Sequence, residues 1–95
     1  MMVEDINAVI TGGSSGLGKA TAELILQNSG KVTIFDTQKD KDTDFVKSVN
    51  GQCDFLLTDV TEESSVVENF SLVKEKFGEI NLVVNCAGIG APEKI

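Results

Sequence analysis

Short runs rich in β-branched residues alternate with segments of helical periodicity, and this alternation constrains the fold more than any other feature of the sequence. The expected strands are residues 6–11, 31–36, 53–57 and 80–85. Helical segments are expected at residues 15–28, around 45–49 and from Thr61 to a stop at Gly78. Because parallel strands are joined by right-handed crossovers, the order β-α-β-α-β-α-β predicts a doubly wound, Rossmann-type parallel sheet with strand order 3-2-1-4.

The first of these strands runs into the segment TGGSSGLGKAT, residues 11–21, which contains the spacing of two kinds of phosphate loop. Read from Gly13, it is one residue short of the triphosphate loop G-x-x-x-x-G-K-[ST]. Ala20 stands where that loop needs a hydroxyl to hold magnesium, and Asp59 is only a weak candidate for a second magnesium ligand. The triphosphate hypothesis is therefore disfavoured.

Read from Gly12, the same segment has the Gly-x-x-x-Gly-x-Gly spacing of a loop for a dinucleotide pyrophosphate. Gly12 is expected to make the tight turn, Gly16 to let backbone approach the pyrophosphate, and Gly18 to let the helix pack on the sheet. A Ser15 hydroxyl and backbone N–H groups near Leu17, at the positive end of the helix, can add hydrogen bonds to the anion. The strand before the loop and the helix after it favour this interpretation.

Asp36 lies 18 residues after Gly18, at the end of the second expected strand. An acidic residue there is placed to accept hydrogen bonds from the adenosine ribose of the cofactor. It also repels the 2′-phosphate of NADP, and no cation stands at Thr37 to offset that charge. The expected cofactor is therefore NAD, preferred over NADP by at least about tenfold, or ~1.4 kcal/mol.

Composition limits the other functions that the chain could have. Its 95 residues suit one small domain, and a net charge of −7 without arginine argues against a nucleic-acid or membrane-surface partner. The sequence contains no histidine, and Cys53 and Cys86 lack a C-x-x-C spacing, so neither a metal site nor a catalytic triad is expected. Both cysteines are expected to be buried, reduced thiols. The N-terminal residues do not resemble a secretory signal.

The motifs TGGSSGLG, TDV and NCAG occur in order, and with them the whole chain resembles the N-terminal part of the short-chain dehydrogenase/reductases. Family members usually carry Asn-Asn-Ala-Gly after the fourth strand, whereas this chain has Cys86 as the second residue of that motif. The resemblance implies a cofactor site whose members surround NAD from the pyrophosphate to the adenine. Ser15 and Leu17 are implied at the pyrophosphate, Asp36 at the ribose, Asp59 and the Val60 backbone at the adenine, and Cys86, Ala87 and Gly88 along the cofactor wall.

Two of these roles have structural alternatives. Asp59 could instead precede and cap the helix that starts near Thr61, and Cys86 could be a packed core thiol. Asn85 is expected to be structural and to tie the fourth strand to its neighbours.

The resemblance also implies a parent oxidoreductase that moves hydride between NAD and a hydroxyl/ketone substrate, either a 3-hydroxyacyl-CoA or a hydroxysteroid. The family's acid–base tyrosine and its lysine, in Tyr-x-x-x-Lys, come after the fourth strand, and the sequence contains no tyrosine. We therefore expect residues 1–95 to be the NAD-binding portion of a single-domain enzyme, without catalytic residues of their own. A homo-oligomer, specifically a tetramer, and a mitochondrial location are implied, with the cytoplasm as the alternative location. A stand-alone, non-catalytic binding or interaction module is the alternative function.

Overall fold

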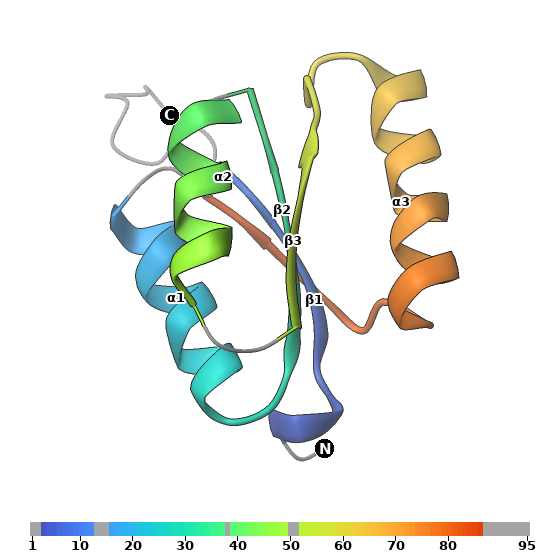
Figure 1. The fold of residues 1–95 in the computed structure, drawn as a ribbon. Helices are drawn as coiled ribbons and strands as arrows, with labels where there is room; N and C mark the ends of the chain where they lie inside the picture. The colour runs from blue at the N-terminus through green and yellow to red at the C-terminus, as the bar shows by residue number, and fades with distance from the viewer. Residues whose placement is uncertain (1–2, 13–15, 38, 50–51, 87–95) are drawn as a thin grey trace, which may run out of the picture.

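The computed structural model describes residues 3–12, 16–37, 39–49 and 52–86 (Figure 1). A short 3-10 helix precedes four strands that alternate with three helices in the described part of the chain. In chain order the elements are η1 Val3–Asp5, β1 Asn7–Thr11, α1 Gly16–Gln27, β2 Lys31–Asp36, α2 Lys39–Ser48, β3 Gln52–Leu57, α3 Glu63–Phe77 and β4 Leu82–Asn85.

The four strands form one parallel sheet in the order β3-β2-β1-β4, which confirms the predicted doubly wound topology. Ile10 at the centre of the sheet is in register with Ile34 of β2 and with Val84 of β4. Figure 1 shows α1 and α2 on one side of the sheet and α3 on the other. The chain therefore changes sides between β1 and β4, where the strand order reverses.

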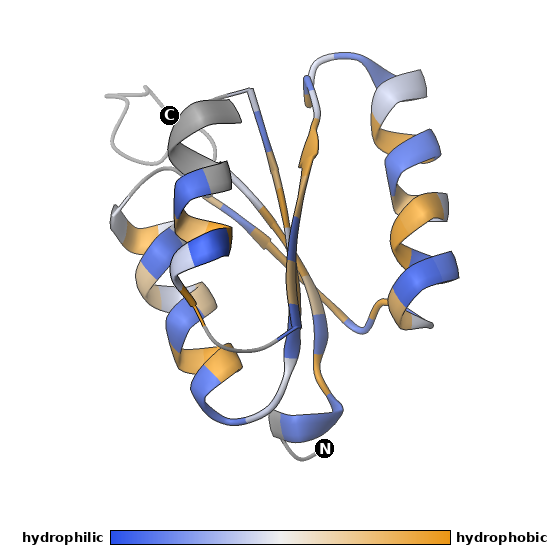
Figure 2. Ribbon diagram, in the orientation of Figure 1, coloured by the Kyte–Doolittle hydropathy of each residue, from blue (hydrophilic) through white to orange (hydrophobic). Residues whose placement is uncertain are grey.

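The face under α1 and α2 carries the larger apolar core. Alternate strand residues point into it, because successive side chains of a strand face opposite sides of the sheet. Hydrophobic segments recur along the strands and in bands on the helices (Figure 2). The buried members are Ala8, Ile10, Val32, Ile34 and Cys86 from the sheet side, Ala22, Ile25 and Leu26 from α1, and Phe45 from α2.

The face under α3 has a smaller apolar core. Val9 and Phe35 of the sheet are buried there together with Val73 of α3. The rings of Phe35 and Phe70 lie 5.4 Å apart, centroid to centroid, in a tilted arrangement. The apolar stripe expected on this helix consists of Val66, Phe70, Val73 and Phe77, which recur at helical spacing. Val73 is buried, and the other three are partly buried.

Two helix starts differ from the sequence prediction. The helix α2 begins at Lys39 and not near Phe45, so its first turns occupy a segment expected to be a charged loop. The segment from Lys39 to Thr43 contains no hydrophobic residue, so only the last turns of α2 gave a periodic signal. The N-cap of α3 is Glu62 and not Thr61, because the Thr61 hydroxyl bonds to the Asp59 carboxylate instead.

The apolar residues whose spacing predicted α1 are only partly the residues that α1 packs against the sheet. Leu17 and Leu24 are exposed, whereas Ala22, Ile25 and Leu26 are buried. The helix itself is as predicted, but its inward face is set by the position of the sheet, which the spacing of leucines does not specify.

A polar network fastens the amino end of β1 to the segment that leads into β4. The Asn7 amide nitrogen Nδ2 donates to the carbonyl oxygens of Gly78, at 2.9 Å, and Glu79, at 3.0 Å. The Asn7 backbone N–H donates to Asn81 Oδ1 at 2.9 Å, and Asn81 Nδ2 donates to the Asp5 carbonyl. These bonds hold the edge strand β4 beside β1 at the end of the sheet opposite to the glycine-rich turn.

Candidate functional site

The carboxyl ends of the strands form a continuous edge, because hydrogen bonding between neighbouring strands extends to the residues that follow them. Gly12 N–H donates to the Phe35 carbonyl, Thr58 N–H to the Asp36 carbonyl and Cys86 N–H to the Thr11 carbonyl, each at 2.9 Å. Three predicted site residues, Gly12, Asp36 and Cys86, therefore lie along one edge of the sheet. Parallel strands lie about 4.8 Å apart, so the four strand ends span roughly 15 Å.

The glycine-rich turn begins in the conformation that the sequence predicted. Gly12 has φ = 73°, in the left-handed region that side chains other than glycine rarely adopt. Gly16 is the first residue of α1, and a Cβ added to it meets nothing within 4 Å. The helix start thus faces open space at the positive end of the helix dipole, which attracts anions.

The remaining members of the turn are placed as follows. Gly18 is buried in α1, in agreement with its expected close packing, and the Leu17 side chain is 53% exposed at the helix start. Ser15 lies outside the described residues.

Asp36 ends β2 beside the glycine-rich turn. It is partly exposed, and its Oδ1 accepts a hydrogen bond of 2.7 Å from the Thr37 backbone N–H. This bond fixes the carboxylate at the carboxyl edge. Leu57, the last residue of β3, is its register partner on the neighbouring strand.

The turn between β3 and α3 contains the two predicted adenine-binding residues. Asp59 Oδ1 accepts hydrogen bonds from the Thr61 hydroxyl, at 2.6 Å, and from the Thr61 backbone N–H, at 3.0 Å. These two hydrogen bonds lower the pKa of the exposed Asp59 carboxyl, which keeps it ionised and therefore purely an acceptor. Asp59 thus has the structural role considered as an alternative, in the turn before α3, while the Val60 side chain beside it is 44% exposed.

At the switch point between β1 and β4, the Thr11 hydroxyl donates to Asn85 Oδ1 at 2.7 Å. Asn85 therefore ties β4 to β1, as expected. Cys86, next to it, is a free thiol with 2% exposure and packs in the core under α1 and α2, the alternative role considered for it. Cys53 likewise forms no disulfide but is only half-buried, so the prediction that both thiols are buried holds for Cys86 alone. Ala87 and Gly88 lie outside the described residues.

Two residues near this edge, Thr58 and Asn69, were not predicted from the sequence to belong to the site. Asn69 of α3 donates from Nδ2 to the Thr58 hydroxyl oxygen, at 2.7 Å, and to the Leu57 carbonyl, at 3.2 Å. The sequence signal was a polar residue adjoining Phe70 in the apolar stripe of this helix, on the side that turns toward the sheet.

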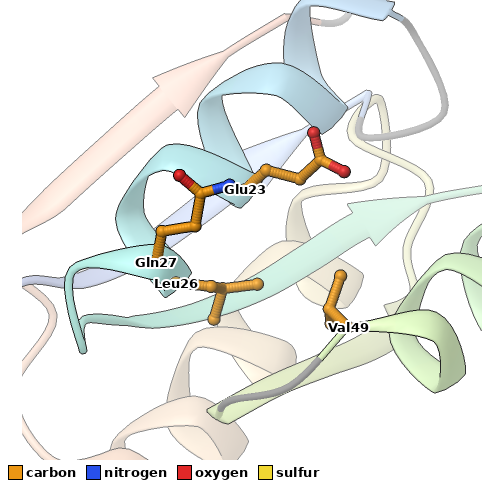
Figure 3. A pocket seen from close by; sticks show the side chains of 4 residues that line it. All are labelled: Glu23, Leu26, Gln27 and Val49. Carbon is orange, nitrogen blue, oxygen red and sulfur yellow. The ribbon is translucent and has the colours of Figure 1, made fainter.

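A cavity of about 410 Å³ lies at the opposite end of the sheet, between the last turn of α1 and the residues before β3 (Figure 3). It is lined by Glu23, Leu26, Gln27 and Val49. Among the residues that the structure describes, none of the predicted site residues lines it. Its position distinguishes it from the carboxyl edge, where ligands of doubly wound sheets bind.

Within residues 3–12, 16–37, 39–49 and 52–86, no three acidic, cysteine or histidine side chains are grouped as a metal site would need. None of the helices in the same described segments is both long and apolar enough to cross a membrane.

The chain is similar to known dehydrogenases over nearly its whole length. The family model described as short chain dehydrogenase matches residues 6–95. Two relatives, the 3-hydroxyacyl-CoA dehydrogenase type-2 proteins of Rattus norvegicus and Drosophila melanogaster, are 39% and 36% identical to 97% and 98% of this chain. The chain spans only 35% and 36% of their lengths.

A solved structure supports the same relationship. The short chain dehydrogenase from Bacillus anthracis matches 90% of this chain with a TM-score of 0.82 and 27% sequence identity, and the match covers 36% of that structure's chain. With the glycine-rich turn, the parallel sheet and the family model in agreement, the chain belongs to the short-chain dehydrogenase family.

Proposed function

We propose that this chain is the NAD-binding portion of an oxidoreductase. The observation that carries the proposal is the open space in front of Gly16, where an added Cβ would meet no protein atom within 4 Å. A glycine at the first position of a helix contributes less to stability than alanine, so its presence without steric need favours a ligand that approaches the backbone there. Its neighbours along the edge supply matching groups for a dinucleotide.

The described residues fit the three parts of a dinucleotide. The turn at Gly12 and the helix start at Gly16 and Leu17 hold the pyrophosphate through backbone N–H groups and the helix dipole. The Asp36 carboxylate accepts hydrogen bonds from the adenosine ribose, and the turn of Asp59 and Val60 receives the adenine. When bound, the nicotinamide ring supplies the hydride acceptor or donor, and the protein supplies binding and orientation.

The preference for NAD over NADP rests on Asp36. Its carboxylate accepts hydrogen bonds from two ribose hydroxyls, whereas a 2′-phosphate places like charges together. Thr37, the next residue, carries no charge that could offset this repulsion. The preference is therefore built into the end of β2.

We propose a hydroxyl/ketone substrate of the 3-hydroxyacyl-CoA or hydroxysteroid class for the complete protein, on the strength of the relatives named as 3-hydroxyacyl-CoA dehydrogenases. The acid–base tyrosine expected in this family is not among these residues, since the sequence contains no tyrosine. The proposal accordingly assigns cofactor binding, and not the proton transfer, to residues 1–95. A mitochondrial homotetramer belongs to the same proposal.

The test is titration of the full-length protein with NADH and NADPH. NADH is expected to bind at least about tenfold more tightly. Gly16→Val should abolish binding of both, because the new side chain fills the space that the pyrophosphate needs. It should change the melting temperature little, because a Cβ added at Gly16 meets nothing within 4 Å. Ala20→Val, at an exposed position of the same helix, is the matched control and should bind normally.

Asp36→Ala tests the second half of the proposal. Loss of the carboxylate should weaken NADH and relax discrimination against NADPH. Wild-type protein that binds neither nucleotide, or a Gly16→Val variant that binds NADH normally, contradicts the proposed function.

A further inference from the structure

The turn between β3 and α3 is held by the side chains of Thr58 and Asn69. Thr58, the residue after β3, is 1% exposed, and its hydroxyl donates to the Leu56 carbonyl at 2.8 Å. The same oxygen accepts from Asn69 Nδ2 at 2.7 Å. Asn69 lies 11 residues further along the chain, in the second turn of α3, and also donates to the Leu57 carbonyl at 3.2 Å. We refer to Thr58 and Asn69 as the turn clasp.

The clasp replaces the connection that an N-terminal cap makes in other helices between the helix and the preceding loop. The N-cap residue of α3 is Glu62, whose side chain makes no capping hydrogen bond. Most helices satisfy their first N–H groups through a side chain of that residue and so fix the preceding loop to the helix. Asn69 makes the corresponding connection from within α3, since it binds the chain just before the turn and not the helix end itself.

The clasp is continuous with the end of β2. Thr58 N–H donates to the Asp36 carbonyl at 2.9 Å, so one buried residue is bonded both to the ribose-binding strand and to α3. Beyond Thr58, the turn closes on itself through Glu62 N–H to the Asp59 carbonyl, at 2.9 Å, and through the two Thr61 bonds to Asp59 Oδ1. Asp59 and Val60 are therefore exposed residues on a turn whose base is fixed at both sides.

We propose that Thr58 and Asn69 are positioning residues for the adenosine half of the cofactor. They hold the turn of Asp59 and Val60 at a constant distance from Asp36, so that the groups that recognise adenine and ribose are preorganised before the ligand arrives. This inference rests on the proposed function. Preorganisation improves affinity because the binding free energy is not spent on ordering the loop.

The experiment measures the affinities of the full-length protein for two ligands by titration calorimetry. Each ligand contains one half of the cofactor. ADP-ribose contains the adenosine half, and reduced nicotinamide mononucleotide contains only the other half. Asn69→Leu should weaken ADP-ribose about tenfold, equivalent to ~1.4 kcal/mol. It should change the affinity for the mononucleotide by no more than about twofold, the scatter expected of an independent site.

Thr58 provides an isosteric and a conservative variant. Thr58→Val keeps the shape of the side chain and removes the hydroxyl, so it should weaken ADP-ribose as Asn69→Leu does. The double variant should weaken ADP-ribose by less than the sum of the two single effects, because the substitutions break one hydrogen bond in common and one more each. Thr58→Ser keeps the hydroxyl and should retain the wild-type affinity. If Asn69→Leu does not fold, the Thr58 pair carries the test by itself.

Asn28→Leu is the matched control. It removes an Nδ2–carbonyl hydrogen bond of 2.8 Å, to Leu24, at the far end of α1, and should leave both affinities unchanged. A clasp that acts only on stability lowers the melting temperature without altering ADP-ribose affinity, and that result overturns the proposal. Equal weakening of both ligands also overturns it. Wild-type protein that binds neither ligand refutes the proposed function, whereas binding by the wild type with no effect of the variants refutes only the clasp.

Discussion

The two faces of the sheet are built in different ways. Under α1 and α2, the buried core residues come from β1, β2, the residue after β4 and the two helices, and partly buried residues of β3 pack against them. Under α3, the buried apolar residues are Val9, Phe35 and Val73, and polar groups bond at both ends of the helix. The first face supplies most of the apolar burial. The second face connects α3 to the loops before and after it.

The position of these polar groups explains the difference. At the carboxyl end of the sheet, Asn69 of α3 binds the turn that precedes the helix. At the amino end, Asn7 of β1 donates to the carbonyls of Gly78 and Glu79, the two residues that follow α3. Apolar contacts are not directional and tolerate small displacements, whereas hydrogen bonds specify a position. The polar contacts on the α3 face therefore fix the position of the turn before α3, to which the proposed function assigns the adenine.

The largest expected effect comes from the apolar face. Ile34 is fully buried in the core under α1 and α2, so Ile34→Ala should lower the free energy of unfolding by about 2–5 kcal/mol through lost transfer energy and an unfilled cavity. Urea denaturation of the full-length protein measures it. Val83→Ala, at a 52% exposed position of β4, is the control and should change stability by less than about 0.5 kcal/mol. A loss of similar size at both positions contradicts the comparison.

Asn7→Ala should have the next largest effect, because it breaks the connection of α3 to the amino end of the sheet. Two carbonyl groups, of Gly78 and Glu79, lose their donor, and each such loss costs about 1 kcal/mol or more. We expect a total of about 2–3 kcal/mol in the free energy of unfolding. Asn28→Ala removes one exposed bond and should cost much less. Equal losses in the two variants would show that the Asn7 network contributes no more to the free energy of unfolding than one exposed hydrogen bond.

Thr33→Val should have a smaller effect of opposite sign. Thr33 is 1% exposed, and its hydroxyl has no hydrogen-bond partner in the described part of the chain. Removing a buried, unpaired hydroxyl while keeping the side-chain shape should stabilise the protein by about 1 kcal/mol. The same substitution at Thr58, whose hydroxyl makes two hydrogen bonds, should destabilise it by a similar amount. Thermal unfolding of the two variants tests whether polar groups on this face matter through their pairing.

The fold could be predicted because its signals are local. Strands of β-branched residues, helices ended by glycine and the turn from Gly12 to Gly18 each lie within a short stretch of sequence, and the handedness of the crossovers then determines the order of the strands. The first turns of α2 were missed because the sequence from Lys39 to Thr43 contains no hydrophobic residue and therefore carries no periodic signal. The positions of Gly16 and Asp36 followed from the same local motif.

The polar connections could not be predicted because they join residues far apart in the chain. Asn7 and Gly78 are 71 positions apart, and Thr58 and Asn69 are 11 apart on different elements. A sequence shows that these residues are polar, but their partners depend on where α3 crosses the sheet. The angle and depth of that crossing depend on how Val9, Phe35 and Val73 pack together. Their hydrophobic character is equally compatible with other positions of α3 on the sheet.

The smallest expected effect is a dependence on pH that only the α3 side of the molecule should show. The hydrogen bonds from Thr61 lower the pKa of Asp59 in the folded state below its ordinary value of 3.8. A lowered folded pKa means that the stabilisation is present above the unfolded pKa and is lost as pH falls through the folded pKa. Asp59→Asn should therefore reduce the decline in stability below about pH 4, and the gap between the variant and the wild type should be wider at neutral pH than in acid.

Thr61→Val, which removes the hydroxyl donor but keeps the carboxylate, should reduce the same decline in part. Ile34→Ala, whose surroundings under α1 and α2 contain no carboxylate among the buried core members, should shift the whole stability curve without changing its dependence on acid. Acid titration of unfolding, followed by circular dichroism, separates the three variants. If Asp59→Asn and the wild type lose stability in parallel as the pH falls, the turn before α3 is not held by the ionised carboxylate. The polar face would then depend on Asn7, Thr58 and Asn69, none of which titrates.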